Sequence, residues 1–202
     1  MKLIRFIGSF LTLLSLSLFF APTEGAFAGS PVTLTFDDLP GPYIPAGYGG
    51  LQWSNFFVLS FDQVIPSGFS NGMVSAPKVA FNASGNPAVL GGTTFDLNSA
   101  YVTGGWNDGL QVEVKGFVGS TLTYDNTWTV NSTAPTLVDF NYLGITSAEF
   151  ISSGGVPHGY SSGGSGTEFA MDNQTITVPE PSTLALAGLG AAALITFRRR
   201  RD

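Results

Sequence analysis

Apolar and polar side chains alternate with a period of two through much of the middle of the chain. The pattern is clear at 31–36 and returns at 111–115 and 121–124. Alternation of this kind is typical of strands that bury one face. Turn-forming residues, such as Gly91-Gly92, separate these segments. Further strands are predicted at 51–59, 78–81, 136–140, 145–151 and 169–178.

These short strands and their glycine- and proline-rich turns predict an all-β fold. No convincing 3.6-residue apolar stripe is found between residues 29 and 178. Such a pattern favours a sandwich or jelly roll over a helical or α/β fold. We therefore expect a single jelly-roll-like β-sandwich domain at 29–178.

The first 28 residues have the composition of a signal peptide. Lys2 and Arg5 form a positively charged start, the stretch from Ile4 to Phe20 is largely apolar, and Ala26-Phe27-Ala28 supplies small residues for cleavage. These three parts are those of a secretory signal. The predicted mature chain begins at Gly29, outside the cytoplasmic membrane.

Charge and cysteine content exclude several functions for residues 29–178. The region has two lysines, no arginine and eleven acidic residues, a net charge of −9. A nucleic-acid-binding protein needs clustered cations, so this function is excluded. The whole chain contains no cysteine, which excludes disulfides, thiolate metal sites and thiol catalysis.

Sequence motifs give no support for catalysis, and we predict that the protein is not an enzyme and has no catalytic residues. The single histidine, His158, lies in a serine- and glycine-rich loop at 152–166. This loop is a plain spacer or a binding loop. A glycosidase, which needs two carboxylates, stays open as an alternative, although no pair of acidic residues stands out.

Aromatic residues in loops are candidates for stacking on sugar rings. Trp106 lies in a turn-like stretch, and Tyr43 and Tyr48 flank another loop. Exposed aromatic rings pack on apolar faces of ligands. The alternative for Trp106 is that it folds back over the edge of the sandwich. Trp53 and Trp128 lie in predicted strands, and we expect them in the core.

Three carboxylates predict a structural calcium ion. Asp37 and Asp38 follow the first strand, and Asp172 lies in the last. The first and last strands of a jelly roll commonly lie near each other, and crowded carboxylates need a cation. Alternatively, Asp37 and Asp38 accept hydrogen bonds from backbone N–H groups in the turn at 39–42.

The C-terminal tail contains an apolar segment of fourteen residues from Leu184 to Phe197, followed by Arg198 to Arg201. As a helix it would be about 21 Å long, against a hydrocarbon core of roughly 30 Å. We expect it to insert only transiently in the inner membrane. Arg198, Arg199, Arg200 and Arg201 would stop transfer on the cytoplasmic side.

Pro179-Glu180-Pro181, the apolar segment and the arginines together resemble the PEP-CTERM sorting signal of Gram-negative bacteria. The resemblance implies recognition by an exosortase, processing near Pro179, Glu180 and Pro181, and delivery to the cell surface or extracellular matrix. Genes of that family accompany exopolysaccharide production. The predicted sorting signal covers residues 179–202.

The body also resembles exported domains of unassigned function, whose ends are similar to those of jelly-roll carbohydrate-binding modules. The closing strand of such modules reads apolar-Asp-Asn-apolar, and this chain departs by having Gln174 after Asp172-Asn173. The departure predicts a β-bulge. The segments that resemble the family are 35–39, 48–55, 68–72, 80–82, 105–109 and 169–173.

The expected function is a structural or adhesive role at the cell surface or in the matrix, with exopolysaccharide or another envelope component as partner. The alternative from a different class is a lectin-like carbohydrate-binding module that uses Trp106, Tyr43 and Tyr48. Binding to an array of glycans distinguishes the two.

Overall fold

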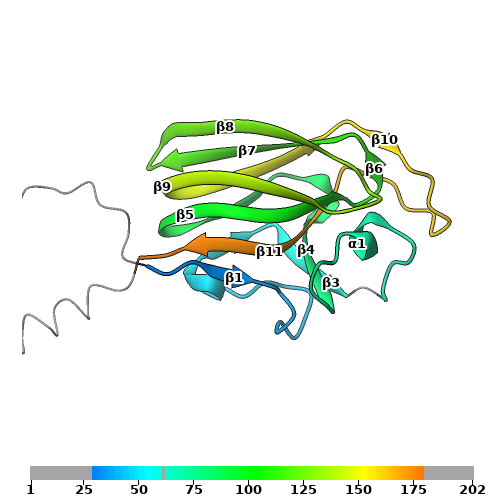
Figure 1. Cartoon of the computed structure of the whole chain (residues 1–202), viewed down its shortest axis with the longest axis horizontal. Coiled ribbons are helices and arrows are strands. Elements are labelled where there is room, and N and C mark those ends of the chain that lie inside the picture. Colours follow the sequence, from blue (N-terminus) through cyan, green and yellow to red (C-terminus); the bar gives the residue numbers. More distant parts are fainter. Residues whose placement is uncertain (1–28, 61, 180–202) are drawn as a thin grey trace, which may run out of the picture.

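The computed structural model describes residues 29–60 and 62–179. The predicted signal peptide at 1–28 and residues 180–202 of the predicted sorting signal lie outside the described residues. Strands dominate the described part, which confirms the all-β prediction (Figure 1). The strands are β1 (Val32–Leu34), β2 (Gln52–Ser54), β3 (Phe56–Ser60), β4 (Lys78–Asn82), β5 (Ala88–Gly104), β6 (Asn107–Asp108), β7 (Leu110–Val118), β8 (Thr121–Val130), β9 (Thr136–Ser153), β10 (Val156–Pro157) and β11 (Phe169–Thr177).

The helices of the described part are short. They are α1 (Gly68–Asn71) and the 3-10 turns η1 (Tyr48–Gly50) and η2 (Ala83–Gly85). Within the described residues, no helix has the length and apolar character needed to cross a membrane.

Strand β5 is long and folds back on itself, and it was missed by the sequence prediction. The Asn82 side chain donates to the carbonyl of Asn86, just before β5, at 3.1 Å, and accepts from the N–H of Phe169 at 2.8 Å. Phe169 pairs with Gly104 at the other end of β5, so both ends of the strand lie together. The pairing with β9 shifts between Gly91 and Phe95.

The prediction of a strand-ending turn at Gly91-Gly92 was therefore wrong. The two glycines lie inside β5, and Gly92 has a φ of 100°, which favours glycine. They let the strand bend without ending, as glycines at bulges commonly do. The predicted strands at 136–140 and 145–151 are likewise one strand, β9, whose Gly144 has a φ of 64°.

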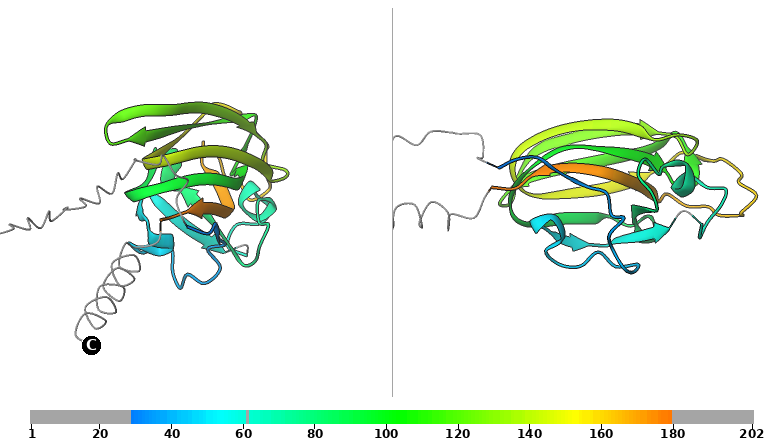
Figure 2. Two further views of the ribbon diagram at one scale, coloured as in Figure 1. Left: turned by 60° about the vertical axis from the view of Figure 1, so that its left-hand side comes forward. Right: turned by 60° about the horizontal axis from the view of Figure 1, so that its bottom comes forward.

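The bent strands β5 and β9 connect two layers, which Figure 2 shows one above the other. The first part of β5 pairs with β2 and with the last part of β9, which also pairs with β7. The second part of β5 pairs with β11 and the first part of β9. The fold is a jelly-roll-like β-sandwich, as predicted. Its main core contains Phe36, Leu51, Phe56, Leu90, Phe95, Leu97, Val112, Val114, Phe140, Phe150, Phe169 and Met171, with Trp53 and Trp128 packed against it as predicted.

The first and last strands are neighbours, as expected for a jelly roll. Strand β1 pairs antiparallel with β11, with Leu34 opposite Gln174. The pairing of β11 with β5 shifts between Asp172 and Thr175, and Asn173 has a φ of 47°. The predicted bulge at Gln174 is confirmed. Its amide is fully buried and has no hydrogen-bond partner among the described residues.

Helix α1 covers part of the outer face of the layer that contains β11. The Ser67 and Ser70 side chains form a reciprocal capping box at its start. Phe69 is 4% exposed and packs with Val79 of β4 and Ala170 of β11. A second, smaller hydrophobic cluster therefore lies outside the main core, between α1 and the sheet.

Candidate functional site

Strands β3 and β4 are hydrophobic on both faces. Phe57 lies opposite Phe81 in the register, and both are only partly buried, whereas their neighbours Phe56, Val58 and Ala80 are buried in the core. Because successive side chains of a strand point to opposite faces, Phe57 and Phe81 lie on the outer face of the sandwich. Polar residues are the usual occupants of such positions.

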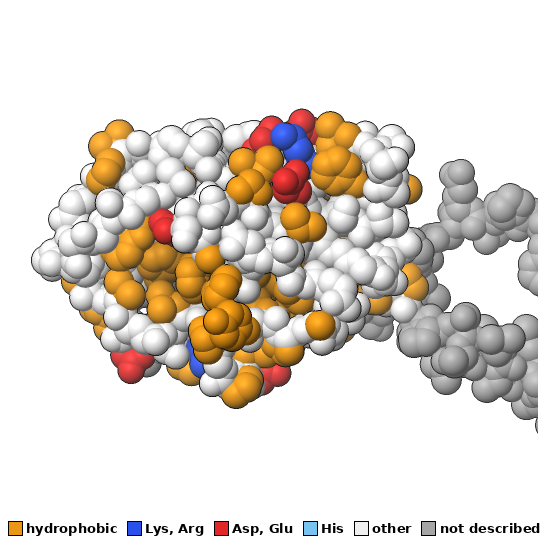
Figure 3. Space-filling model, turned by 180° about the vertical axis from the view of Figure 1, so that it is seen from behind, with side chains coloured by type: hydrophobic (Ala, Val, Ile, Leu, Met, Phe, Trp, Pro, Cys, Tyr) orange, Lys and Arg blue, Asp and Glu red, His pale blue; other side chains and the backbone are white. Residues whose placement is uncertain are grey.

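Five aromatic rings follow one another across this outer face. Their centroids are 5.1 to 6.0 Å apart, a spacing typical of interacting aromatic pairs. Tyr43 begins the row and is 69% exposed. Figure 3 shows a broad hydrophobic area on the side of the molecule opposite to the view of Figure 1. We call the row formed by these rings the aromatic row, and its members in order are Tyr43, Phe57, Phe81, Phe69 and Trp106.

A pocket with a volume of about 350 Å³ lies beside the aromatic row. It lies between the segment Pro40-Gly41-Pro42 and strands β3 and β4. The N–H of Val58 donates to the Pro42 carbonyl at 2.8 Å, which holds this segment along β3. Its apolar lining includes Leu59 and Phe81, and its polar lining includes Ser60, Gln63 and Lys78.

The Lys78 ammonium group is held at the pocket by two backbone carbonyls. It donates to the carbonyl of Asp37 at 3.2 Å and to that of Leu39. The backbone N–H of Lys78 donates to the Asp37 carboxylate at 2.9 Å. These bonds join β4 to the turn that follows β1, and they fix one wall of the pocket.

Trp106 lies at the far end of the aromatic row, where a loop covers it. Its ring packs edge-on against Phe69 at 5.3 Å. An added Cβ at Gly164 would collide with the indole ring, so the backbone of the 152–166 loop lies directly on it. The His158 N–H donates to the Trp106 carbonyl at 2.9 Å. This placement matches the alternative in which Trp106 folds back over the edge, and stacking of Trp106 on sugar stays a prediction.

The Tyr48 side chain is partly buried and bonded to its neighbours, whereas the Tyr43 side chain is exposed. Its hydroxyl donates to Asp38 Oδ1 at 2.9 Å and accepts from the Phe36 N–H at 3.2 Å. Its ring packs near those of Phe36 and Trp53. Burial, and then the hydrogen bond to Asp38, raise the pKa of Tyr48 to about 12. Of the three aromatic candidates predicted from the sequence, Tyr43 is the most accessible.

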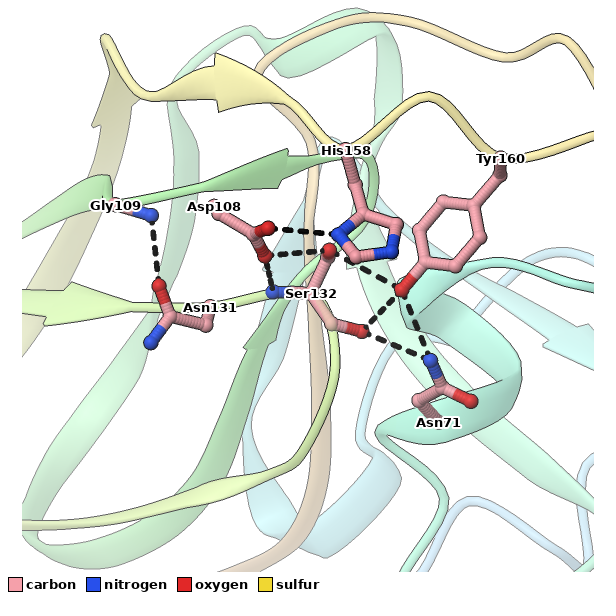
Figure 4. Close-up of polar contacts among 7 residues, drawn as sticks. All are labelled: Asn71, Asp108, Gly109, Asn131, Ser132, His158 and Tyr160. Atoms are coloured by element: carbon pink, nitrogen blue, oxygen red, sulfur yellow. Dashed lines mark hydrogen bonds and ion pairs between the residues drawn. The ribbon is translucent and has the colours of Figure 1, made fainter.

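A second group of polar residues holds one end of the sandwich together (Figure 4). Asp108 accepts from Ser132 Oγ at 2.7 Å and from the Ser132 N–H at 2.8 Å, and it pairs with His158 Nδ1 at 2.7 Å. These hydrogen bonds, chiefly the one from His158, lower the pKa of Asp108 to about 2. The Tyr160 hydroxyl donates to the Ser132 carbonyl at 2.8 Å, and Asn71 Nδ2 donates to the same carbonyl at 3.0 Å.

Asp108, His158 and Ser132 do not have the geometry of a hydrolase triad. In such a triad the imidazole lies between the carboxylate and the serine hydroxyl and accepts the serine proton. Here the carboxylate lies between the other two, and Ser132 is fully buried. The group instead connects the loop to β6 and to the segment after β8.

The loop at 152–166 makes more contacts with the rest of the domain than its serine and glycine content predicts. Strand β9 extends into it as far as Ser153, and β10 pairs with β6. Ser162 Oγ donates to the Pro66 carbonyl at 2.6 Å. The description of this segment as a plain spacer is incomplete, because His158 and Tyr160 bond to residues far away in the sequence.

Asp37, Asp38 and Asp172 each have separate hydrogen-bond donors. Asp37 accepts from the Lys78 N–H and Asp38 from Tyr48, so neither accepts from the turn at 39–42 in the way the alternative proposed. Among the residues described, no three His, Cys, Asp or Glu side chains are grouped so that they could hold a metal ion. The calcium ion stays a prediction, which melting with calcium and with excess chelator tests.

Asp172 connects β11 to the segment after α1. It is fully buried and accepts from the Val74 N–H at 2.7 Å, from the Ser75 N–H at 2.8 Å and from Ser75 Oγ at 3.1 Å. A fourth donor is the N–H of Asn173 at 2.7 Å. Burial raises the pKa of Asp172, and these hydrogen bonds oppose the shift. The carboxylate therefore holds in place the segment after α1, which together with α1 covers part of the outer face of the sheet.

Residues 177–201 match the family described as the PEP-CTERM protein-sorting motif. The tail is a PEP-CTERM sorting motif. This confirms the resemblance drawn from Pro179-Glu180-Pro181 and the arginines, and it makes the protein an exported one. The motif implies processing by an exosortase and transient anchoring in the membrane. A comparison with curated protein sequences found no match.

Several solved structures are similar to the chain in fold, at low identity. An arabinose-bound GH51 α-L-arabinofuranosidase (MgGH51) is 11% identical over 76% of this chain but only 27% of its own, with a TM-score of 0.44. A DUF4465 family protein from Bacteroides ovatus is 10% identical over 74% of this chain and 94% of its own, with a TM-score of 0.38. The CBM51 of a Clostridium perfringens GH95, in complex with methyl-galactose, is 14% identical over 73% and 100%, with a TM-score of 0.34.

Proposed function

We propose that the protein is a non-catalytic component of the cell surface or extracellular matrix that adheres to exopolysaccharide through the exposed part of the aromatic row. The observation that carries the proposal is the position of Tyr43, Phe57 and Phe81 on the outer face of a strand pair whose inner face already forms the core. Export by the PEP-CTERM motif supports it, because the domain then meets surface polysaccharide.

The chemistry of the aromatic row suits a sugar chain. Pyranose rings have apolar C–H faces that pack on aromatic rings, while their hydroxyls need polar partners nearby. Ser60 and Gln63 lie in the adjacent pocket and supply such partners. The hydroxyl of Tyr43 is a further donor and acceptor at the exposed end of the row.

The test is binding of the exported protein to exopolysaccharide isolated from the same cells. We expect Tyr43→Ala to weaken binding about two- to tenfold, because an aromatic contact contributes on the order of 0.5–1.5 kcal/mol. Because the Tyr43 side chain is 69% exposed, the melting temperature should change little. Tyr43→Trp should retain binding.

The matched control is Leu137→Ala, which removes a side chain that is 51% exposed and belongs to β9 rather than to the aromatic row. If Leu137→Ala weakens binding as much as Tyr43→Ala does, the aromatic row is not the binding surface. A lectin-like module is the second candidate. Binding to one glycan of an array, rather than to the bulk polysaccharide, would favour it, and Trp106→Ala then tests whether Trp106 takes part.

A further inference from the structure

The pocket beside the aromatic row contains a lysine without a carboxylate partner among the described side chains. Lys78 and Lys115 are the two basic residues of the region 29–178. The Lys115 ammonium pairs with Glu113 at 3.1 Å. The Lys78 ammonium instead donates to the backbone carbonyls of Asp37 and Leu39. An ammonium group has three N–H donors, so one remains for a ligand.

Gln63 adds further donors to the same pocket. Its amide oxygen accepts from the Ser60 N–H at 2.8 Å. Its NH2 group has no partner among the described residues, so it is available to donate. The side chains of Gln63 and Lys78 therefore offer the pocket an excess of donors, one of which belongs to a cation.

We propose that this pocket is a subsite for a carboxylate-bearing sugar residue, such as a uronic acid, of the polysaccharide. The inference rests on the proposed function and names its ligand class. A carboxylate accepts several hydrogen bonds, and those from charged donors are the strongest. The pocket volume of about 350 Å³ is within the range of small-ligand sites. Leu59 and Phe81 supply an apolar wall for the ring.

The overall charge makes the position of this cation important. A region with a net charge of −9 repels a polyanion at long range, so attraction must come from a local contact. Lys78 is the first residue of β4 and lies opposite Ser60 of β3, next to the aromatic row. One uronate can therefore contact the ammonium group while neighbouring sugars of the same polysaccharide stack on the aromatic rings. A neutral chain gains the stacking and the contacts to its hydroxyls, but not the hydrogen bond from the ammonium to a carboxylate.

The experiment compares two forms of one polymer, polygalacturonate and its carboxyl-reduced product, as ligands of the exported protein. We expect the protein to bind the acidic form about tenfold more tightly, the gain typical of a hydrogen bond to a charged group. Gln63→Glu places a carboxylate in the pocket and should abolish the preference. Lys115→Gln removes a charge elsewhere and should keep it.

Lys78→Gln should also abolish the preference for the acidic polymer. Because this substitution removes hydrogen bonds to two backbone carbonyls, the melting temperature of the variant is measured alongside. Gln63→Glu leaves those bonds intact, so it decides the case if Lys78→Gln does not fold. Equal or weaker binding of the acidic form by the unmodified protein overturns the subsite. If Tyr43→Ala still weakens both polymers, the proposed function stands without it.

Discussion

The two faces of strands β3 and β4 have similar side chains but different surroundings. On the inner face, Phe56 packs edge-on against Phe150 of the opposite layer at 5.5 Å and is 4% exposed. On the outer face, Phe57 and Phe81 contact each other and remain partly exposed. Hydrophobicity on the inner face is explained by folding. Folding explains only part of the hydrophobicity on the outer face, because Phe57 and Phe81 remain partly exposed there. This unexplained exposure is the physical basis for assigning the outer face a binding role.

The difference also lies in how each face is covered. The inner face is closed by a whole layer of strands, whereas α1 and the segment that follows it cover only part of the outer face. Asp172 holds that segment through Val74 and Ser75. Neither α1 nor this segment covers Tyr43, whose side chain is 69% exposed, so this end of the aromatic row is open to solvent.

The sharpest test of the comparison is alanine substitution on the two faces. We expect Phe56→Ala to lower the free energy of unfolding by about 3–5 kcal/mol, the range for a fully buried phenylalanine. Phe81→Ala should cost about half as much, because its ring is already partly in water. Chemical denaturation of both variants measures the difference.

Polysaccharide binding gives the opposite order for the same two variants. Phe81→Ala should weaken binding, while Phe56→Ala should leave it unchanged under conditions where the protein is folded. Equal losses of stability for the two variants, with unchanged binding for both, would show that the outer face is simply a second core.

The next effect concerns the cover on the outer face. Asp172→Asn replaces one of the two acceptor oxygens with an NH2 group, which cannot accept from the N–H groups of Val74, Ser75 and Asn173 that surround the carboxylate. We expect a loss of about 1–3 kcal/mol from the buried donors left unpaired. Hydrogen exchange should rise at Val74 and Ser75 and stay unchanged in β7. The control is Asp139→Asn, an exposed carboxylate on β9, which should cost less than about 0.5 kcal/mol.

Sequence patterns predicted the fold class and most strands because one buried face leaves a period-two trace. They missed β5, because Gly91-Gly92 resembles a turn when only neighbouring residues are considered, while the bend depends on pairing with β9. The Asp108–His158 pair joins residues 50 positions apart, which no local pattern indicates. Phe57 and Phe81 were assigned to strands without a role. The adjacent Phe56-Phe57 was the available signal, since two successive phenylalanines place one on each face.

The smallest expected effect concerns the link between the two faces. Tyr48 packs against core residues Phe36 and Trp53, and its hydroxyl bonds to Asp38 in the segment that leads to Tyr43. Tyr48→Phe removes these hydrogen bonds and should cost about 1 kcal/mol at neutral pH. Binding should weaken slightly, because the segment that carries Tyr43 becomes less fixed.

The pH dependence of this difference identifies its cause. The folded-state pKa of Tyr48 is about 12, above the ordinary value of 10.0, so the stabilising contribution is fully present below pH 10. Between pH 10 and 12 the unfolded chain loses the tyrosine proton first, and the contribution is lost as pH rises through the folded pKa. The stability of the unmodified protein should therefore fall more steeply than that of Tyr48→Phe over this interval. Parallel curves in denaturation experiments across pH 9–12 would mean that the Tyr48 hydroxyl is not buried against Asp38 in solution, and the connection between the core and the aromatic row would then rest on packing alone.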